Sequence, residues 1–187
     1  MGLIIKNKIA QLKKGYPTVS DKYNVQGGIY EGTDALHFGD LLAYGSATGH
    51  YKKLTTSDTV DKLAGICLAT NVKLANRYPG DSNASVETVK GEAFNLLVRG
   101  FIAVAIKDAT AAYKTALAMP EGTKEEKAAK KTAIDAAIAL AAHEGAQVHL
   151  VEGEFATTGG TVVPGAYFTG VTEAVNGEVL AEVNYRM

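Results

Sequence analysis

Histidines are the side chains of this sequence best suited to metal binding or proton transfer, and there are four: His37, His50, His143 and His149. The pair His143-Glu144 resembles the start of a zinc-protease helix, in which two histidines stand four residues apart. The second histidine would fall at position 147, which is occupied by Gln147. His149 follows the helix breaker Gly145 and cannot share a helical face with His143. We therefore predict no metal site, and we expect His143 near the C-terminus of a helix, where the dipole favours a cation.

Carboxylates are the second group of side chains that could carry chemistry. Asp34 with Asp40, or Glu152 with Glu154, could pair on strands as an acid–base dyad, although such pairs are common on solvated strand faces. An enzyme of this kind would need a deep pocket that unites Asp34, Asp40 or Glu152 with a histidine. The sequence has no Gly-x-Ser-x-Gly elbow and no glycine-rich phosphate loop. We expect no enzyme, no cofactor and no small-molecule substrate, with a carboxylate enzyme kept as an alternative.

Composition sets further bounds on the class of protein. The chain has 187 residues, 47% of them hydrophobic, which is one domain of ordinary size or one domain with an insertion. Nineteen basic and 20 acidic residues give a net charge of -1, without a bias toward nucleic acid or anionic membranes. No apolar run approaches the ~20 residues of a membrane span. A single cysteine, Cys67, excludes an internal disulfide and is predicted to be a small buried residue.

Short strands separated by turn residues dominate the predicted structure. Residues 94–106 are predicted as two paired or bent strands, with a bulge or turn near Gly100. Pro164-Gly165 and Asn176-Gly177 are predicted turns. The other predicted strands are Tyr30 and residues 41–44, 51–54, 63–69, 148–151, 162–163, 166–171 and 179–185.

The composition becomes rich in alanine and lysine between Asp108 and Gly145, and this stretch predicts two antiparallel helices. Asp108 is expected to cap the first helix, which extends to about Met119. Thr123 and Glu126 have the spacing of a capping box that opens the second helix. Gly145 is expected to end that helix. Lysines and glutamates alternate on the second helix, which is typical of a solvated surface.

The fold class that follows is mainly β with an α insertion. We expect a β-sandwich or a small, tulip-like β-barrel that carries an inserted antiparallel helical hairpin. Three parts are predicted: an N-terminal arm over residues 1–27, a single β domain over residues 28–107 and 146–187, and the hairpin over residues 108–145.

Four segments together give the sequence a resemblance to a known family. They are residues 15–21, which begin with Gly15-Tyr16, residues 35–45, which contain Phe38-Gly39-Asp40, residues 63–66 (Leu-Ala-Gly-Ile) and residues 181–186 (Ala-Glu-Val-Asn-Tyr-Arg). An early glycine, a Phe-Gly step into a strand, a later Ala-Gly-Ile strand and a final Glu-Val strand resemble the capsid decoration (cement) proteins of tailed bacteriophages. The helical hairpin departs from the pattern of that family.

This resemblance implies a structural virion protein that binds the outer surface of a phage capsid and stabilises contacts between major capsid proteins. It implies a homotrimer, or less often a monomer, with the major capsid protein as partner. The protein would be assembled in the host cytoplasm and located on the virion, with no nucleic-acid or membrane partner. Two other classes stay open: a head-fibre base or adhesin that binds host glycans or cells, and a non-viral β-barrel interaction module.

The apolar side chains of the arm need a place to be buried. Either the arm packs on its own domain, or it docks on a neighbouring subunit. The second alternative makes the following residues the expected capsid or subunit interface: Leu3, Ile4, Ile5, Ile9, Leu12 and Tyr16.

Overall fold

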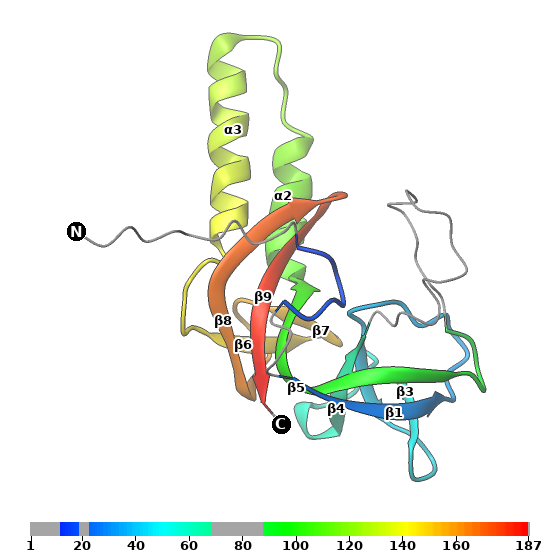
Figure 1. The fold of residues 1–187 in the computed structure, drawn as a ribbon. Helices are drawn as coiled ribbons and strands as arrows, with labels where there is room; N and C mark the ends of the chain where they lie inside the picture. The colour runs from blue at the N-terminus through cyan, green and yellow to red at the C-terminus, as the bar shows by residue number, and fades with distance from the viewer. Residues whose placement is uncertain (1–11, 19–22, 69–87, 187) are drawn as a thin grey trace.

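The computed structural model describes residues 12–18, 23–68 and 88–186, and within them nine strands, two α helices and one 3-10 turn. Figure 1 shows two curved groups of strands joined by one long strand, with a pair of helices standing away from them. The strands are β1 (Asn24–Tyr30), β2 (Leu41–Tyr44), β3 (His50–Lys53), β4 (Leu63–Cys67), β5 (Ala93–Ala105), β6 (Gln147–Val151), β7 (Glu154–Ala156), β8 (Thr161–Val175) and β9 (Glu178–Arg186). The helical elements are η1 (Val60–Lys62), α2 (Lys107–Leu117) and α3 (Lys124–Ala139).

The first five strands form a closed β-barrel. Their order is β1-β3-β2-β4-β5, and β1 closes the circle by pairing with β5. Only the β1–β3 pair is parallel. The barrel interior is filled by aromatic and aliphatic side chains and by Cys67, which is buried as predicted. The mainly β class and the small barrel of the sequence prediction are therefore confirmed; the strands named here do not establish a sandwich.

The last strands continue the sheet beyond the barrel. Their order is β5-β9-β8-β6-β7, so β5 belongs to both halves. A second core lies between this sheet and the outer face of the barrel, because Leu41, Leu63 and Ile66 of the barrel cluster with Ile102 and Val183 of the sheet. The two halves are thus held together by one strand and one shared apolar layer.

Backbone chemistry explains where the strand predictions succeed and where one fails. Asn176 (φ 51°) and Gly177 (φ 81°) form the two-residue turn between β8 and β9, as predicted. Pro164 and Gly165 were predicted as a turn, but they lie inside β8. Gly165 has a φ of 73°, and the β6–β8 register shifts across it, so the pair makes a bulge in one long strand. Gly100 similarly sits within β5, which is one 13-residue strand.

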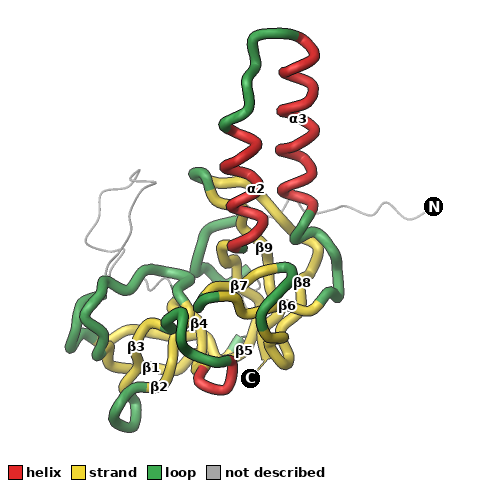
Figure 2. The backbone as a smooth tube through the Cα atoms, turned by 180° about the vertical axis from the view of Figure 1, so that it is seen from behind, coloured by secondary structure: helices red, strands yellow, loops and turns green. Residues whose placement is uncertain are grey.

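Helices α2 and α3 follow one another between β5 and β6 and contact each other, and they project away from the strands in both views (Figures 1 and 2). The capping box is confirmed: Thr123 Oγ1 accepts from Glu126 N, and the Glu126 carboxylate accepts from Thr123 N. Two helix boundaries differ from the prediction. Ile106 is the N-cap of α2, and Asp108 lies inside the first turn, where its carboxylate accepts hydrogen bonds from both Ala109 N and Thr157 N. The second helix ends at Ala139, before Gly145.

Asp58, in the loop between β3 and η1, predicts an acid-dependent loss of stability. Its carboxylate accepts from the Thr55 hydroxyl at 2.7 Å and the Thr55 N–H at 2.9 Å, and these bonds, with a smaller contribution from Lys62, lower its pKa to about 2. Because the unfolded chain binds this proton near pH ~3.9, the stabilisation is present above that pH and is lost as the pH falls toward 2. Urea midpoints measured from pH 6 to pH 2 should fall more steeply for the wild type than for Asp58→Asn. Parallel curves would contradict the assignment.

Candidate interaction surface

Residues 12–18, the N-terminal segment, lie along an edge of β5. Gly15 N–H donates to Ala103 O at 2.8 Å, and Ala103 N–H donates to Tyr16 O at 3.2 Å. Pro17 and Ile102 form an antiparallel bridge. The N-terminal segment therefore extends the sheet of its own domain in the manner of a short additional strand.

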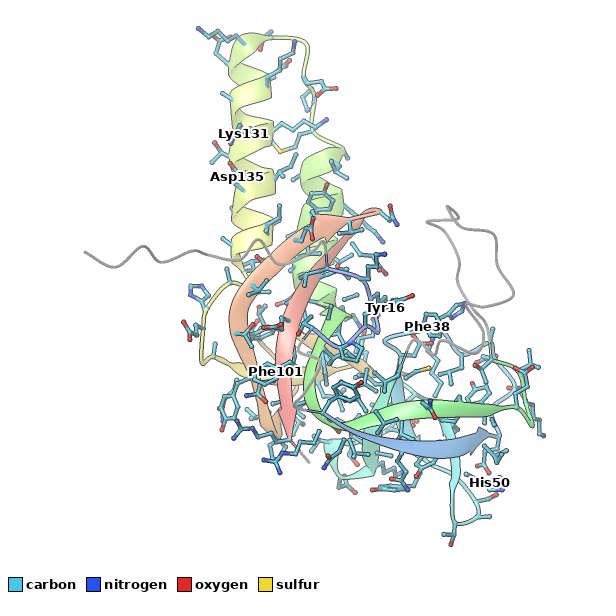
Figure 3. The ribbon with its side chains drawn as sticks, viewed as in Figure 1. Tyr16, Phe38, His50, Phe101, Lys131 and Asp135 are labelled. Carbon is cyan, nitrogen blue, oxygen red and sulfur yellow. The ribbon has the colours of Figure 1, made fainter. Side chains whose placement is uncertain are left out.

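Leu12 and Tyr16 are the two predicted interface residues that the structure describes. Leu12 is only 3% exposed and clusters with Ala103 and Leu180, so its side chain is buried by its own chain. Tyr16 is half-buried, and its ring meets the Phe38 ring edge-on at 6.3 Å (Figure 3). The remaining predicted residues lie outside the described part of the chain: Leu3, Ile4, Ile5 and Ile9.

The N-terminal segment also meets the Phe38-Gly39-Asp40 step. Gly15 (φ 76°) and Gly39 (φ 80°) both have left-handed backbone conformations that favour glycine. A Cβ on Gly15 would lie 2.6 Å from Gly39 N, so the two backbones approach more closely than any side chain allows. Two of the segments on which the family resemblance was based are thus neighbours in space.

Three of the four carboxylates considered as a possible catalytic site, Asp40, Glu152 and Glu154, line a cleft between the barrel and the sheet. We call it the charged cleft. It has a volume of about 210 Å³, and its lining includes Lys14, Asp40, Lys53, Glu152, Glu154 and Phe155. Asp40 and Glu152 are therefore brought to one place. Asp34 is not part of this lining; its carbonyl accepts a hydrogen bond from the Tyr30 hydroxyl.

Lysines neutralise the acids of the charged cleft. Lys53 Nζ lies 3.0 Å from Asp40 Oδ2, and Lys107 pairs with Glu152 and lies 3.7 Å from Glu154. The hydrogen bond between Lys107 and Glu152 raises the pKa of the lysine and lowers the pKa of the glutamate. Both groups stay charged at neutral pH, which suits an ion pair and does not suit a general acid.

The four histidines lie apart from one another. His37 Nδ1 is 3.6 Å from Asp40 Oδ2, and His50 Nδ1 is 3.7 Å from Glu31 at the far end of the barrel (Figure 3). His149 Nδ1 contacts Gly159 O at 2.7 Å, and His143 is exposed after the end of α3. Among the described residues, no group of three or more His, Cys, Asp or Glu side chains is arranged to hold a metal ion.

A second cleft, the arginine cleft, lies where β5 passes from the sheet into the barrel. It has a volume of about 300 Å³ and is lined by Tyr23, Asn24, Arg99, Phe101, Asn184 and Arg186. These residues come from the start of β1, the middle of β5 and the end of β9. Sequence reasoning missed the cleft because the arginines are far apart in the chain and belong to no motif. Figure 3 places Phe101 beside β9, away from the helices.

Helices α2 and α3 present a mixed polar surface. Lys131 pairs with Asp135 at 2.6 Å on the exposed side of α3 (Figure 3). Leu117, at the end of α2, and Leu140, just after α3, are partly exposed, so neither side chain is fully buried between the two helices. No helix in the described ranges is long and apolar enough to cross a membrane.

Comparison with known proteins gives a match in three-dimensional structure and none in sequence. No protein-family model matches the chain, and no curated protein matches it. Among solved structures, the chain resembles a chain of "The capsid of Myoviridae Phage XM1" with a TM-score of 0.55 and 15% sequence identity. The match covers 100% of this chain and 97% of that one. At this identity the comparison shows that the two chains share their fold over nearly their whole length.

Proposed function

We propose that this chain is a structural virion protein that binds the outer surface of a phage capsid and stabilises contacts between major capsid proteins. The observation that carries the proposal is the end-to-end match in fold to a chain of the Myoviridae phage XM1 capsid. The match covers 100% of this chain and 97% of that one. The segments that resemble decoration proteins support the same conclusion independently of the fold.

The surface of the molecule is suited to binding a protein partner. Several large apolar or aromatic side chains are more than a third exposed on the strands and the segments beside them: Tyr23, Val25, Tyr44, Val89 and Tyr167. Burying the exposed part of such a side chain contributes a fraction of the roughly 1.5–3 kcal/mol that full burial of a large apolar side chain contributes. Repetition of a modest contact over a capsid lattice adds to the stability of the whole particle.

We further propose that the protein has no catalytic role and acts as a homotrimer on the particle. The ion pairs in the charged cleft support a structural role for Asp40 and Glu152, because Asp40 pairs with Lys53 within the barrel and Glu152 pairs with Lys107 at the start of α2. An adhesin that binds host glycans or cells is the competing proposal, and the projecting helices α2 and α3 would be its contact surface (Figure 1).

Cosedimentation tests the proposal directly. The purified chain is mixed with undecorated heads of the phage that encodes it, before and after head expansion. We expect saturable binding to heads and a trimer mass on the particle. A version lacking residues 1–11 tests whether that segment contributes. Absence of binding to either form of head, together with binding to host cells, would overturn the capsid proposal in favour of the adhesin.

A further inference from the structure

The arginine cleft is lined by two positive charges, and within the described part of the chain no acidic residue is among its lining residues. Arg99 and Arg186 are directly opposite each other on β5 and β9. Like charges at opposite positions of an antiparallel pair are destabilising. Within the described residues, neither guanidinium takes part in an ion pair, and the only polar contact found for either is the hydrogen bond from Arg186 Nε to Asn184 Oδ1 at 3.3 Å. An anionic group placed between them would remove this repulsion.

An open strand edge begins at the same cleft. Tyr30 N–H donates to Glu92 O on the β5 side, whereas Ile29 N–H donates to Gly49 O on the opposite side. Because these directions alternate along a strand, the backbone groups of Val25 and Gly27 point away from β5. Strand β3 pairs with β1 only at Ile29 and Tyr30, so it does not cover them.

The open edge is exposed and has apolar side chains beside it. Residues 24–27 are all exposed, and a Cβ on Gly27 would meet no atom within 4 Å. Tyr23 and Val25 are 40% and 42% exposed. A strand edge with free N–H and C=O groups is a template for another extended chain. Such an edge requires both donors and acceptors from its partner, which a peptide backbone supplies and a simple anion or a phosphate backbone does not.

We propose that the β1 edge and the arginine cleft bind an extended acidic segment of a capsid protein of the same particle. The segment adds as a strand beside residues 24–28, and one of its carboxylates lies between Arg99 and Arg186. Val25 and Tyr23 contact its apolar side chains. This inference rests on the proposed function, since it assigns the partner segment that the chain recognises on the particle.

Two pairs of variants test this site. Arg99→Gln with Arg186→Gln removes the cationic pair, and Lys124→Gln with Lys127→Gln removes the same charge from the exposed surface of α3. Gly27→Pro removes the outward N–H, which edge strands tolerate in the fold, whereas Gly27→Ala keeps that N–H. Binding is measured to undecorated heads and to a synthetic peptide of alternating Glu and Val, with an alternating Lys and Val peptide as the control probe.

The expected result is that the arginine variant and Gly27→Pro each bind heads and the Glu–Val peptide at least about tenfold more weakly, because each loses charge-assisted or backbone hydrogen bonds. The lysine variant and Gly27→Ala should bind like the wild type. If both test variants bind heads as tightly as the wild type does, the edge site is overturned and the proposed function is not. Peptide binding without binding to heads would overturn both this partner and the proposed function. A wild-type dimer that the arginine variant dissociates would assign the edge to a second copy and overturn the inference.

Discussion

Leu96→Ala and Leu97→Ala will each lower the free energy of unfolding by about 2–5 kcal/mol, although the two residues are adjacent on one strand. Neighbouring residues of a strand point to opposite faces, and in most sheets one of the two faces solvent. Here Leu96 lies in the barrel interior and Leu97 in the core between barrel and sheet, and both are 0% exposed. Each truncation therefore leaves a cavity in a different core.

Chemical denaturation of the two variants measures this effect, and Asn95→Ala is the matched control. Asn95 is exposed on the same strand, so its replacement should change the stability by no more than about 0.5 kcal/mol. A single shared transition for both leucine variants would show that barrel and sheet unfold together, as expected from a strand common to both. A loss confined to one of the two variants would contradict the two-core arrangement.

Gly15→Ala will lower the stability by about 2–5 kcal/mol, through two effects at one position. The left-handed backbone at φ 76° costs an alanine roughly 1–2 kcal/mol. The added methyl group would also lie 2.6 Å from both Gly39 N and Phe38 Cβ, and overpacking of this kind costs about 1–3 kcal/mol. The N-terminal segment would have to move away from the Phe38-Gly39 step to relieve it.

Gly91→Ala separates the two effects. Gly91 also has a left-handed backbone, with φ 87°, but a Cβ there meets no atom within 4 Å. Its replacement should cost only the conformational part, about 1–2 kcal/mol. Thermal melting of both variants, with limited proteolysis near residue 15, measures the difference. Equal losses in the two variants would show that the contact between the N-terminal segment and Gly39 adds nothing to stability.

The features that the sequence predicted correctly depend on residues close together in the chain. The Asn176-Gly177 turn follows from two residues that accept positive φ at little cost, and the capping box follows from Thr123 and Glu126 three positions apart. Strand β2 matches the predicted residues 41–44 because its apolar run is bounded by Asp40 and Gly45. Such local rules also established the mainly β class with helices between strands.

Local rules failed where a distant segment overrides a local preference. Pro164-Gly165 has the composition of a turn, but β6 pairs with β8 before and after it and β9 pairs from Ala166 onward, which keeps it in β8 as a bulge. Asp108 has the chemistry of a helix cap, but it lies inside the first turn of α2, where its carboxylate accepts from the distant Thr157 N as well as from Ala109 N.

Sequence alone thus determined several of the strands, the two helices and the capping box of this protein. Tertiary structure decided what those elements bring together: the closure of the barrel by β1 and β5, the contact of Gly15 with Gly39, and the opposition of Arg99 and Arg186. The physical reason is that strand register is set by hydrogen bonds between segments far apart in the chain. A pattern of neighbouring residues does not specify which other strand a given strand will pair with.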